Sequence, residues 1–130
     1  CLEKIKMAIS SEIVLPVPGD AVHGGIHHLF VLRIIPERVG MDRDAFVAEL
    51  KEENIGTGIH YRVPHQYPWY ADFYAAHPGA LPEGGLPRAE WSSERLLRLP
   101  LWPGLTEEDQ DGVVAALRQV IARGRARTRA

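Results

Sequence analysis

Hydrophobic and polar positions follow two clear patterns in the first half of the chain. Residues 28–35 form an unbroken β-branched and aromatic run that stops at Pro36. Such a run predicts a central strand that is buried on both faces. Residues 42–54 instead place apolar side chains on one side of a helix and acidic ones on the other, with Asp42 as a candidate N-cap. This pattern predicts a helix that packs against the strand.

The second half ends in a strongly periodic segment. Its apolar stripe at spacing i, i+1, i+4, i+7 and i+8 consists of Val113, Val114, Leu117, Val120 and Ile121. Thr106 and Asp109 resemble a capping box at the start, and Gly124 is placed to end the helix. The sequence therefore predicts a helix over residues 106–123.

Shorter patterns fill the remaining length. We expect a strand at residues 56–61, an aromatic-rich helix within 66–77, a Pro/Gly-rich loop at 78–87 and a strand at 96–99. Leu2, Ile5 and Ile9 share a helical face, and residues 16–20 form a turn-rich connector. A few strands separated by helices predict a small two-layer α/β arrangement of the α+β kind.

Length and charge add limits to this picture. The 130 residues fit one domain, for which we expect a helix end and linker at 1–20, the folded domain at 21–124 and a basic, solvated tail at 125–130. A net charge of −2 gives no reason to expect nucleic acid binding. The single cysteine, Cys1, fits a reducing compartment, so we expect a cytoplasmic protein. The sequence has no apolar run long enough to predict membrane insertion.

The residue types of common catalytic and metal sites do not combine into a complete set here. His23, His27 and His28 are close in sequence, but His27 and His28 would point to opposite faces of a strand. No Cys or carboxylate set completes a four-ligand metal site, so we expect no metal. None of the lysines, Lys4, Lys6 and Lys51, lies in an apolar setting that would lower its pKa for carbonyl chemistry. We therefore expect no catalytic residue within this chain.

One short segment does concentrate hydrogen-bonding groups. His60, Tyr61, Arg62 and His65 follow a predicted strand end, where ligand groups often lie. Arginine offers a planar fork for phosphate, and the other side chains can bond sugar hydroxyls. Burying such groups without partners is costly, so we expect them to be at least partly exposed. A polar edge at a domain surface explains the same residues equally well.

The same segment, residues 58–65, resembles the signature in the small domain of DegT/StrS-type nucleotide-sugar aminotransferases. Other blocks match the family in the same order, namely the strand at 28–33, the aromatic stretch at 67–70, the block at 91–101 and the ending at 103–109. The resemblance covers about residues 25 to 123. Residues 56–62 and 90–95 look most like the subgroup that makes 4-amino-4-deoxy-arabinose on a uridine nucleotide.

The resemblance implies the C-terminal small domain of a type I pyridoxal-phosphate (PLP) aminotransferase, with a short, mainly antiparallel sheet covered by helices. In this family a large N-terminal domain holds the cofactor, so PLP is expected in the full-length enzyme and not on this chain alone. The resemblance also implies a homodimer, a nucleotide-sugar substrate, and substrate contacts from His65 first, with His60, Tyr61 and Arg62 beside it. A non-catalytic binding or scaffold module, and a small regulatory ligand-binding domain, remain as alternatives.

Overall fold

The fold is built on three short antiparallel strands. The structure is a computed structural model that describes residues 4, 5, 9, 11–14 and 28–129. Strands β1 (Ile13–Val14), β2 (Phe30–Ile34) and β3 (Leu96–Leu99) pair in the order β1-β2-β3, with Ile13 opposite Ile34 and Phe30 opposite Leu99. The predicted central strand and the predicted α/β class with an antiparallel sheet are confirmed. Leu2, His23, His27 and the connector at 16–20 lie outside the described residues.

Strand β2 is buried on one face only, which corrects the prediction of a strand buried on both. Phe30, Leu32 and Ile34 are buried, whereas Val31 and Arg33 between them are half-buried. Side chains alternate across a strand, so an unbroken apolar run does not by itself show that both faces are covered. The second face is covered in part by Trp91, whose ring lies 4.7 Å from the Arg33 guanidinium carbon.

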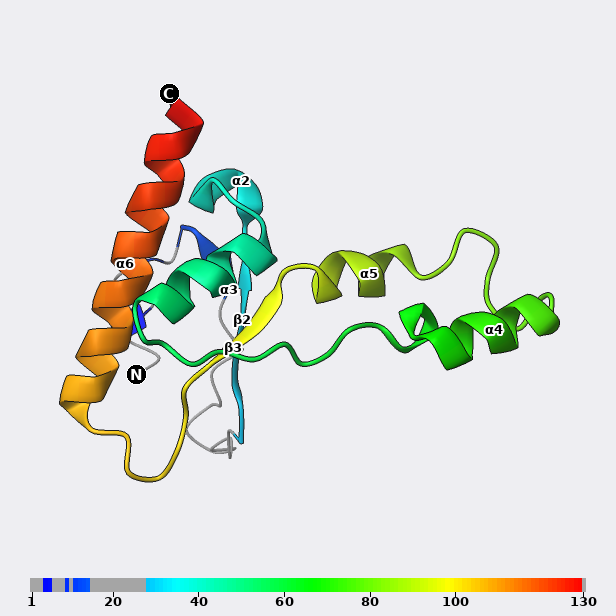
Figure 1. Ribbon diagram of the computed structural model, residues 1–130, viewed down its shortest axis with the longest axis horizontal. Helices are drawn as coiled ribbons and strands as arrows, with labels where there is room; N and C mark the ends of the chain where they lie inside the picture. The colour runs from blue at the N-terminus through cyan, green and yellow to red at the C-terminus, as the bar shows by residue number, and fades with distance from the viewer. Residues whose placement is uncertain (1–3, 6–8, 10, 15–27, 130) are drawn as a thin grey trace, which may run out of the picture.

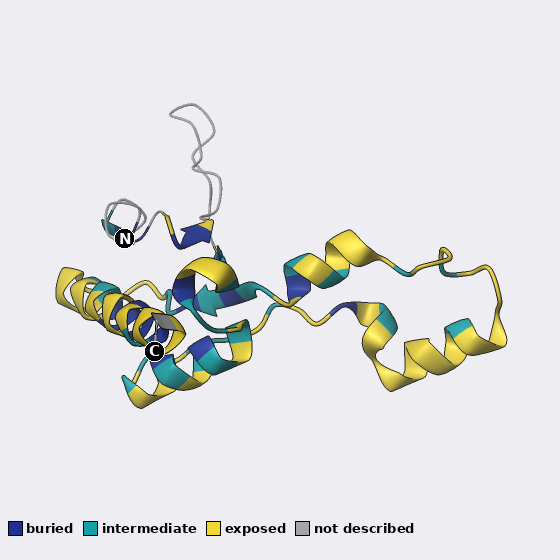
Figure 2. Cartoon of the chain, turned by 90° about the horizontal axis from the view of Figure 1, so that it is seen from above, coloured by how far each residue is buried: buried dark blue, intermediate teal, exposed yellow. Residues whose placement is uncertain are grey.

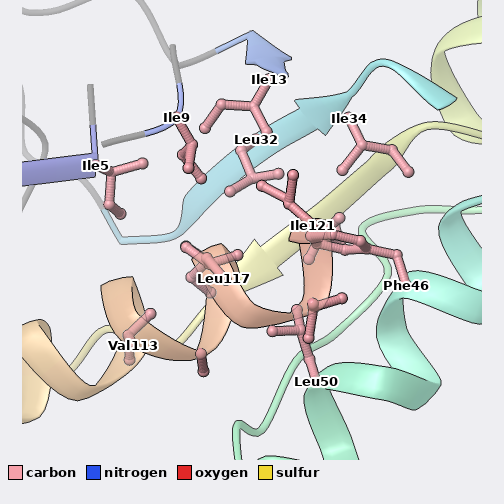
Figure 3. Close-up of a cluster of buried hydrophobic side chains, with 14 of the residues drawn as sticks. Ile5, Ile9, Ile13, Leu32, Ile34, Phe46, Leu50, Val113, Leu117 and Ile121 are labelled. Carbon is pink, nitrogen blue, oxygen red and sulfur yellow. The ribbon is translucent and has the colours of Figure 1, made fainter. Parts of the chain in front are cut away.

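Three helices follow the sheet or cover it: α2 (Pro36–Val39), α3 (Arg43–Glu52) and α6 (Glu107–Arg129). Figure 1 shows α3 and α6 on one side of the sheet. Between these layers lie the buried side chains of Leu32, Phe46, Leu50 and Leu117, together with Ile5 from the N-terminal residues (Figure 3). Asp42 caps α3 as predicted, since its carboxylate accepts a hydrogen bond from the Ala45 N–H at 2.8 Å.

Helix α6 begins as predicted but does not end at Gly124. Thr106 and Asp109 form the reciprocal hydrogen bonds of a capping box, at 2.9 Å from the Thr106 N–H and 3.1 Å from the Asp109 N–H. The helix then continues to Arg129. Gly124 is needed for close packing instead, because a Cβ there would lie 2.1 Å from the Val39 carbonyl oxygen. A glycine at the expected helix end was therefore misread as a C-cap.

The predicted strand at residues 56–61 is also wrong. Only Gly58 pairs with the sheet, through an isolated antiparallel bridge to Arg98 with N···O distances of 3.3 and 2.7 Å. The chain then leaves the edge of β3 and enters a 3-10 helix, η1 (Pro64–Gln66), in which Pro64 has no N–H to offer a sheet. The single bridge between Gly58 and Arg98 therefore fixes the point at which the chain leaves the sheet.

Residues 64–93 project away from the sheet, and we call this segment the aromatic arm. It consists of η1, α4 (Pro68–Ala76), a loop, and α5 (Pro87–Ser93). Figure 1 shows α4 and α5 on the opposite side from α6, and Figure 2 shows that most of their surface is exposed. The helix within 66–77 and the loop at 78–87 are confirmed, while α2, α5 and β1 were not predicted.

Candidate functional site

The candidate site begins at Gly58, where the chain meets Arg98. A Cβ at Gly58 would lie only 2.6 Å from the Arg98 Nε and 3.2 Å from the His60 Cε1. Glycine is therefore required for the backbone to pass between these two side chains. His60 is half-buried, and its ring contacts that of Tyr61 at a centroid distance of 4.7 Å.

Two buried nitrogen atoms flank Gly58. His60 Nδ1 and Arg98 Nε are both buried without a hydrogen-bond partner among the residues that the structure describes. A buried polar nitrogen without a partner costs about 1–3 kcal/mol, and such groups are concentrated at functional sites. The pair therefore marks this end of the segment as a place where hydrogen bonding is incomplete among the described residues.

Tyr61 and Arg62 line a groove at the base of the aromatic arm. The groove has a volume of about 460 Å³, and the remaining lining residues are Val63, Pro64, Tyr67, Tyr70, Ala89, Ser92, Ser93 and Leu96. The Tyr61 backbone is fixed by the Ser93 hydroxyl, which donates a hydrogen bond of 2.9 Å to its carbonyl oxygen. Ser93 is itself held by Arg43, whose guanidinium donates to the Ser93 carbonyl at 2.9 Å. The groove thus has a rigid floor, and the Tyr61 side chain above it is 69% exposed.

His65 makes an internal contact instead of facing solvent. Its Nε2 lies 2.8 Å from the Glu90 Oε1 on α5, and its side chain is only 9% exposed. The same oxygen accepts a hydrogen bond of 3.0 Å from the Leu86 N–H. The Leu86 N–H and then the His65 ring hold the pKa of the Glu90 carboxyl below its ordinary value. His65 and Glu90 therefore tie the two ends of the aromatic arm together.

The four predicted residues do not converge on one point. Tyr61 and Arg62 share the groove and are exposed, as expected, and His60 is half-buried beside Arg98. His65 is half-buried as a residue, and its side chain, which is 9% exposed, is satisfied by Glu90. Sequence reasoning missed Glu90 and Arg98 as neighbours of the site, because both lie more than twenty residues away along the chain. The one signal in the sequence that could have pointed to Arg98 was the predicted strand at 56–61. A strand there implied, only loosely, that Gly58 pairs with another strand, as it does at Arg98.

The described lysines do not fit a PLP site. Lys4 lies 2.8 Å from Asp111 and 3.7 Å from Glu107, and the hydrogen bond to Asp111 raises the pKa of its ammonium group. A lysine that attacks a carbonyl needs a lowered pKa instead. Lys51 is exposed on α3, and Lys6 lies outside the described residues. No step of cofactor chemistry can therefore be assigned to the described part of this chain.

The described residues contain neither a cluster that could hold a metal ion nor a helix that could span a membrane. Residues 28–129 and the described N-terminal positions bring together no group of three or more His, Cys, Asp or Glu side chains that could hold a metal ion. Within the same residues, no helix is both long and apolar enough to cross a bilayer.

The comparisons with known proteins agree on one family. The DegT/DnrJ/EryC1/StrS aminotransferase family model matches residues 6–118. The aminotransferase TlmJ from Streptoalloteichus hindustanus is 25% identical with a TM-score of 0.70, and the match covers 94% of this chain and 30% of that one. A DegT DnrJ EryC1 StrS aminotransferase from Brucella abortus is 26% identical with a TM-score of 0.65, covering 91% and 28%.

A third structure supports the fold. Spr1654 from Streptococcus pneumoniae, assigned as a sugar aminotransferase and solved in its PMP form, is 17% identical with a TM-score of 0.76, covering 98% of this chain and 31% of that one. This chain thus spans about 30% of the length of the structures it matches. The family model covers far more than half of the chain. The chain belongs to the DegT/DnrJ/EryC1/StrS aminotransferase family.

Proposed function

We propose that this chain is the C-terminal small domain of a PLP-dependent aminotransferase that moves an amino group from an amino acid, with glutamate as the expected donor, to a keto-sugar nucleotide. The observation that carries the proposal is the family match over residues 6–118. The 30% coverage of TlmJ supports the further inference that a large domain completes the enzyme. The described lysines supply no suitable amine, so the lysine that holds the cofactor is assigned to that large domain.

Within this domain, Tyr61 and Arg62 are the residues best placed to contact the substrate. Both are exposed and line the groove of about 460 Å³. The Arg62 guanidinium makes no ion pair with any described residue, so its donors are available for a phosphate group, which it can bind with two parallel N–H bonds. The Tyr61 hydroxyl can form a hydrogen bond with a sugar hydroxyl, and the Tyr61 ring can stack on a face of the sugar.

His60 and His65 belong to the same proposed site but are less exposed. His60 lies beside Arg98, whose Nε has no hydrogen-bond partner among the described residues. His65 holds Glu90, and through Glu90 it sets the separation of the groove walls on η1 and α5. We assign His65 to orienting the substrate and not to proton transfer.

A finer resemblance supports a proposal for the class of sugar. Residues 56–62 and 90–95 favour the uridine-nucleotide subgroup whose product is a 4-amino-4-deoxy-arabinose. Of these residues, Tyr61 and Arg62 line the groove, and Glu90 holds His65. A homodimer is proposed for the complete enzyme on the same resemblance.

The test is an amino-transfer assay with the complete protein that carries this segment. We expect glutamate and a keto-sugar nucleotide to give 2-oxoglutarate and the amino sugar, whereas the 130-residue chain alone gives neither and binds no stoichiometric PLP. Absence of transfer to every keto-sugar nucleotide tested, with PLP bound to the complete protein, would contradict the proposed substrate class. A one-to-one PLP complex of the short chain that survives dilution would contradict the assignment of the cofactor to the large domain.

A further inference from the structure

Helix α4 of the aromatic arm has an unusual surface. None of its nine residues is buried, although seven of them are aromatic or alanine. Trp69 is 67% exposed, and Tyr70 and Phe73 are also exposed. Large exposed apolar patches on a protein surface mark sites of contact with another protein surface or a ligand. An isolated helix of this length would also be marginal in water without tertiary packing.

The aromatic residues of α4 occupy two different faces. Trp69 and Phe73 stack at 5.6 Å with planes 11° apart, and Phe73 stacks on His77 at 4.2 Å, which gives one continuous ladder along the helix. Tyr67 and Tyr70 instead line the groove toward α5. Helix α5 can cover only the groove side, so the ladder of Trp69, Phe73 and His77 faces outward.

The ladder is well suited to a protein surface. Asp72 is the only charged side chain in α4, so few charges would need to be desolvated on docking. Stacked aromatic side chains have few rotamers to lose, and the Trp69 indole keeps an N–H to offer a carbonyl. Interface anchors have this composition, with tryptophan and tyrosine among the commonest hot-spot residues.

We propose that the outward ladder of the aromatic arm docks on the large portion of the aminotransferase that lies outside these residues. This inference rests on the proposed function. TlmJ aligns with 94% of this chain over only 30% of its own length, so most of such an enzyme is available as the occupant. The ladder is also continuous with the groove of Tyr61 and Arg62 through Tyr67 and Tyr70. Docking would therefore cover the ladder on the face of the aromatic arm that does not line the groove.

A second copy of this chain would cover the same residues but would not complete the site. The described residues of this chain provide no cofactor lysine, and a second copy would provide none either. The large portion supplies both the cover and the missing chemistry. His65 and Glu90, which fix the ends of the aromatic arm to each other, give it the rigidity that a docking element needs.

The test compares amide hydrogen exchange in the 130-residue chain and in the complete protein. We expect the amides of α4 to exchange about 10-fold or more slowly in the complete protein, while those of the buried stretch of α6 around Leu117 change little. Trp69→Gln combined with Phe73→Gln should restore fast exchange in the complete protein. The matched control is Trp102→Gln, because Trp102 is 49% exposed but lies outside the aromatic arm.

Each outcome decides the proposal. The same double substitution should leave the melting temperature of the short chain unchanged, which shows that it does not act through the core. Equal exchange in both proteins would overturn the docking, and so would slow exchange in the short chain that appears only as it dimerises. Slow exchange in a complete protein that transfers no amino group would keep the docking and remove the proposed function.

Discussion

At the scale of single residues, an added Cβ atom should have opposite effects on stability at Gly124 and at Gly112, the two glycines of α6. A Cβ at Gly124 would meet the Val39 carbonyl oxygen at 2.1 Å, and this oxygen belongs to the backbone. Gly112 lies in the same helix, and a Cβ there would meet nothing within 4 Å. We expect Gly124→Ala to destabilise the chain by about 1–3 kcal/mol through overpacking, and Gly112→Ala to stabilise it by about 0.5–1 kcal/mol through helix propensity. Urea unfolding of both variants measures this, and equal effects would contradict the packing described for Gly124.

The Glu90 carboxyl gives a second prediction at this scale. Its folded-state pKa lies below the ordinary value of about 4.3, because the Leu86 N–H and the His65 ring both donate to it. A lowered pKa means that the stabilisation is fully present above the ordinary value and is lost as pH falls through the folded value. Carbon-detected NMR titration should show the low midpoint, and His65→Ala should raise it only in part, since the Leu86 N–H remains. A midpoint unaffected by His65→Ala would contradict the contact.

At the scale of elements, the C-terminal turn of α6 is part of the fold. The Arg125 guanidinium pairs with Glu12, whose side chain is 7% exposed, and donates to the Arg38 carbonyl at 3.1 Å. Removing it leaves a nearly buried carboxylate unpaired, so we expect Arg125→Ala to cost about 1–3 kcal/mol. Arg127→Ala is the control, because that side chain is 61% exposed and Glu49 keeps its contact to Arg123, so its loss should cost less than about 0.5 kcal/mol. Similar costs for both variants, measured by chemical denaturation, would indicate that residues past Gly124 are only a solvated tail.

The elements that the sequence predicted correctly are those with a strong hydrophobic pattern. Strands β2 and β3 and helices α3 and α6 each carry an apolar run or stripe whose pattern fits that type of element. Elements β1, α2 and α5 have two, four and seven residues, which is too short for such a pattern. The predicted strand at 56–61 failed because only Gly58 meets the sheet, in a single bridge beside Arg98, whereas a Cβ at Gly56 would meet nothing within 4 Å.

The site was predictable in part for a related reason. Residues 60–65 concentrate polar side chains next to each other, and the chain order alone identifies them. Their partners could not be found in the same way, since His65 meets Glu90 across 25 residues and Tyr61 meets Ser93 across 32. These contacts depend on how the aromatic arm folds back at its loop. The loop has no periodic hydrophobic pattern from which this fold-back could be predicted.

At the scale of the whole molecule, a compact layer of sheet and helices carries an exposed projection. The core is closed by α3 and α6, whereas the groove of Tyr61 and Arg62 lies where the aromatic arm leaves the sheet (Figure 1). This arrangement separates stability from ligand contact at Tyr61 and Arg62, because both side chains are exposed and neither belongs to the buried core. The kinetic effect of a groove residue can therefore be measured in a protein that still folds.

The most direct test of the account is the kinetics of Arg62→Ala in the complete aminotransferase, with Arg88→Ala as the control. Arg62 lines the groove, while Arg88 is also an exposed arginine but lies on α5 outside the groove. Loss of a bidentate phosphate contact should lower kcat/KM for the keto-sugar nucleotide by about 10-fold or more, and should leave the KM for glutamate and the absorbance of bound PLP unchanged. Arg88→Ala should change none of these quantities. Unchanged kinetics in Arg62→Ala, or equal losses in both variants, would contradict the claim that this groove binds the sugar nucleotide.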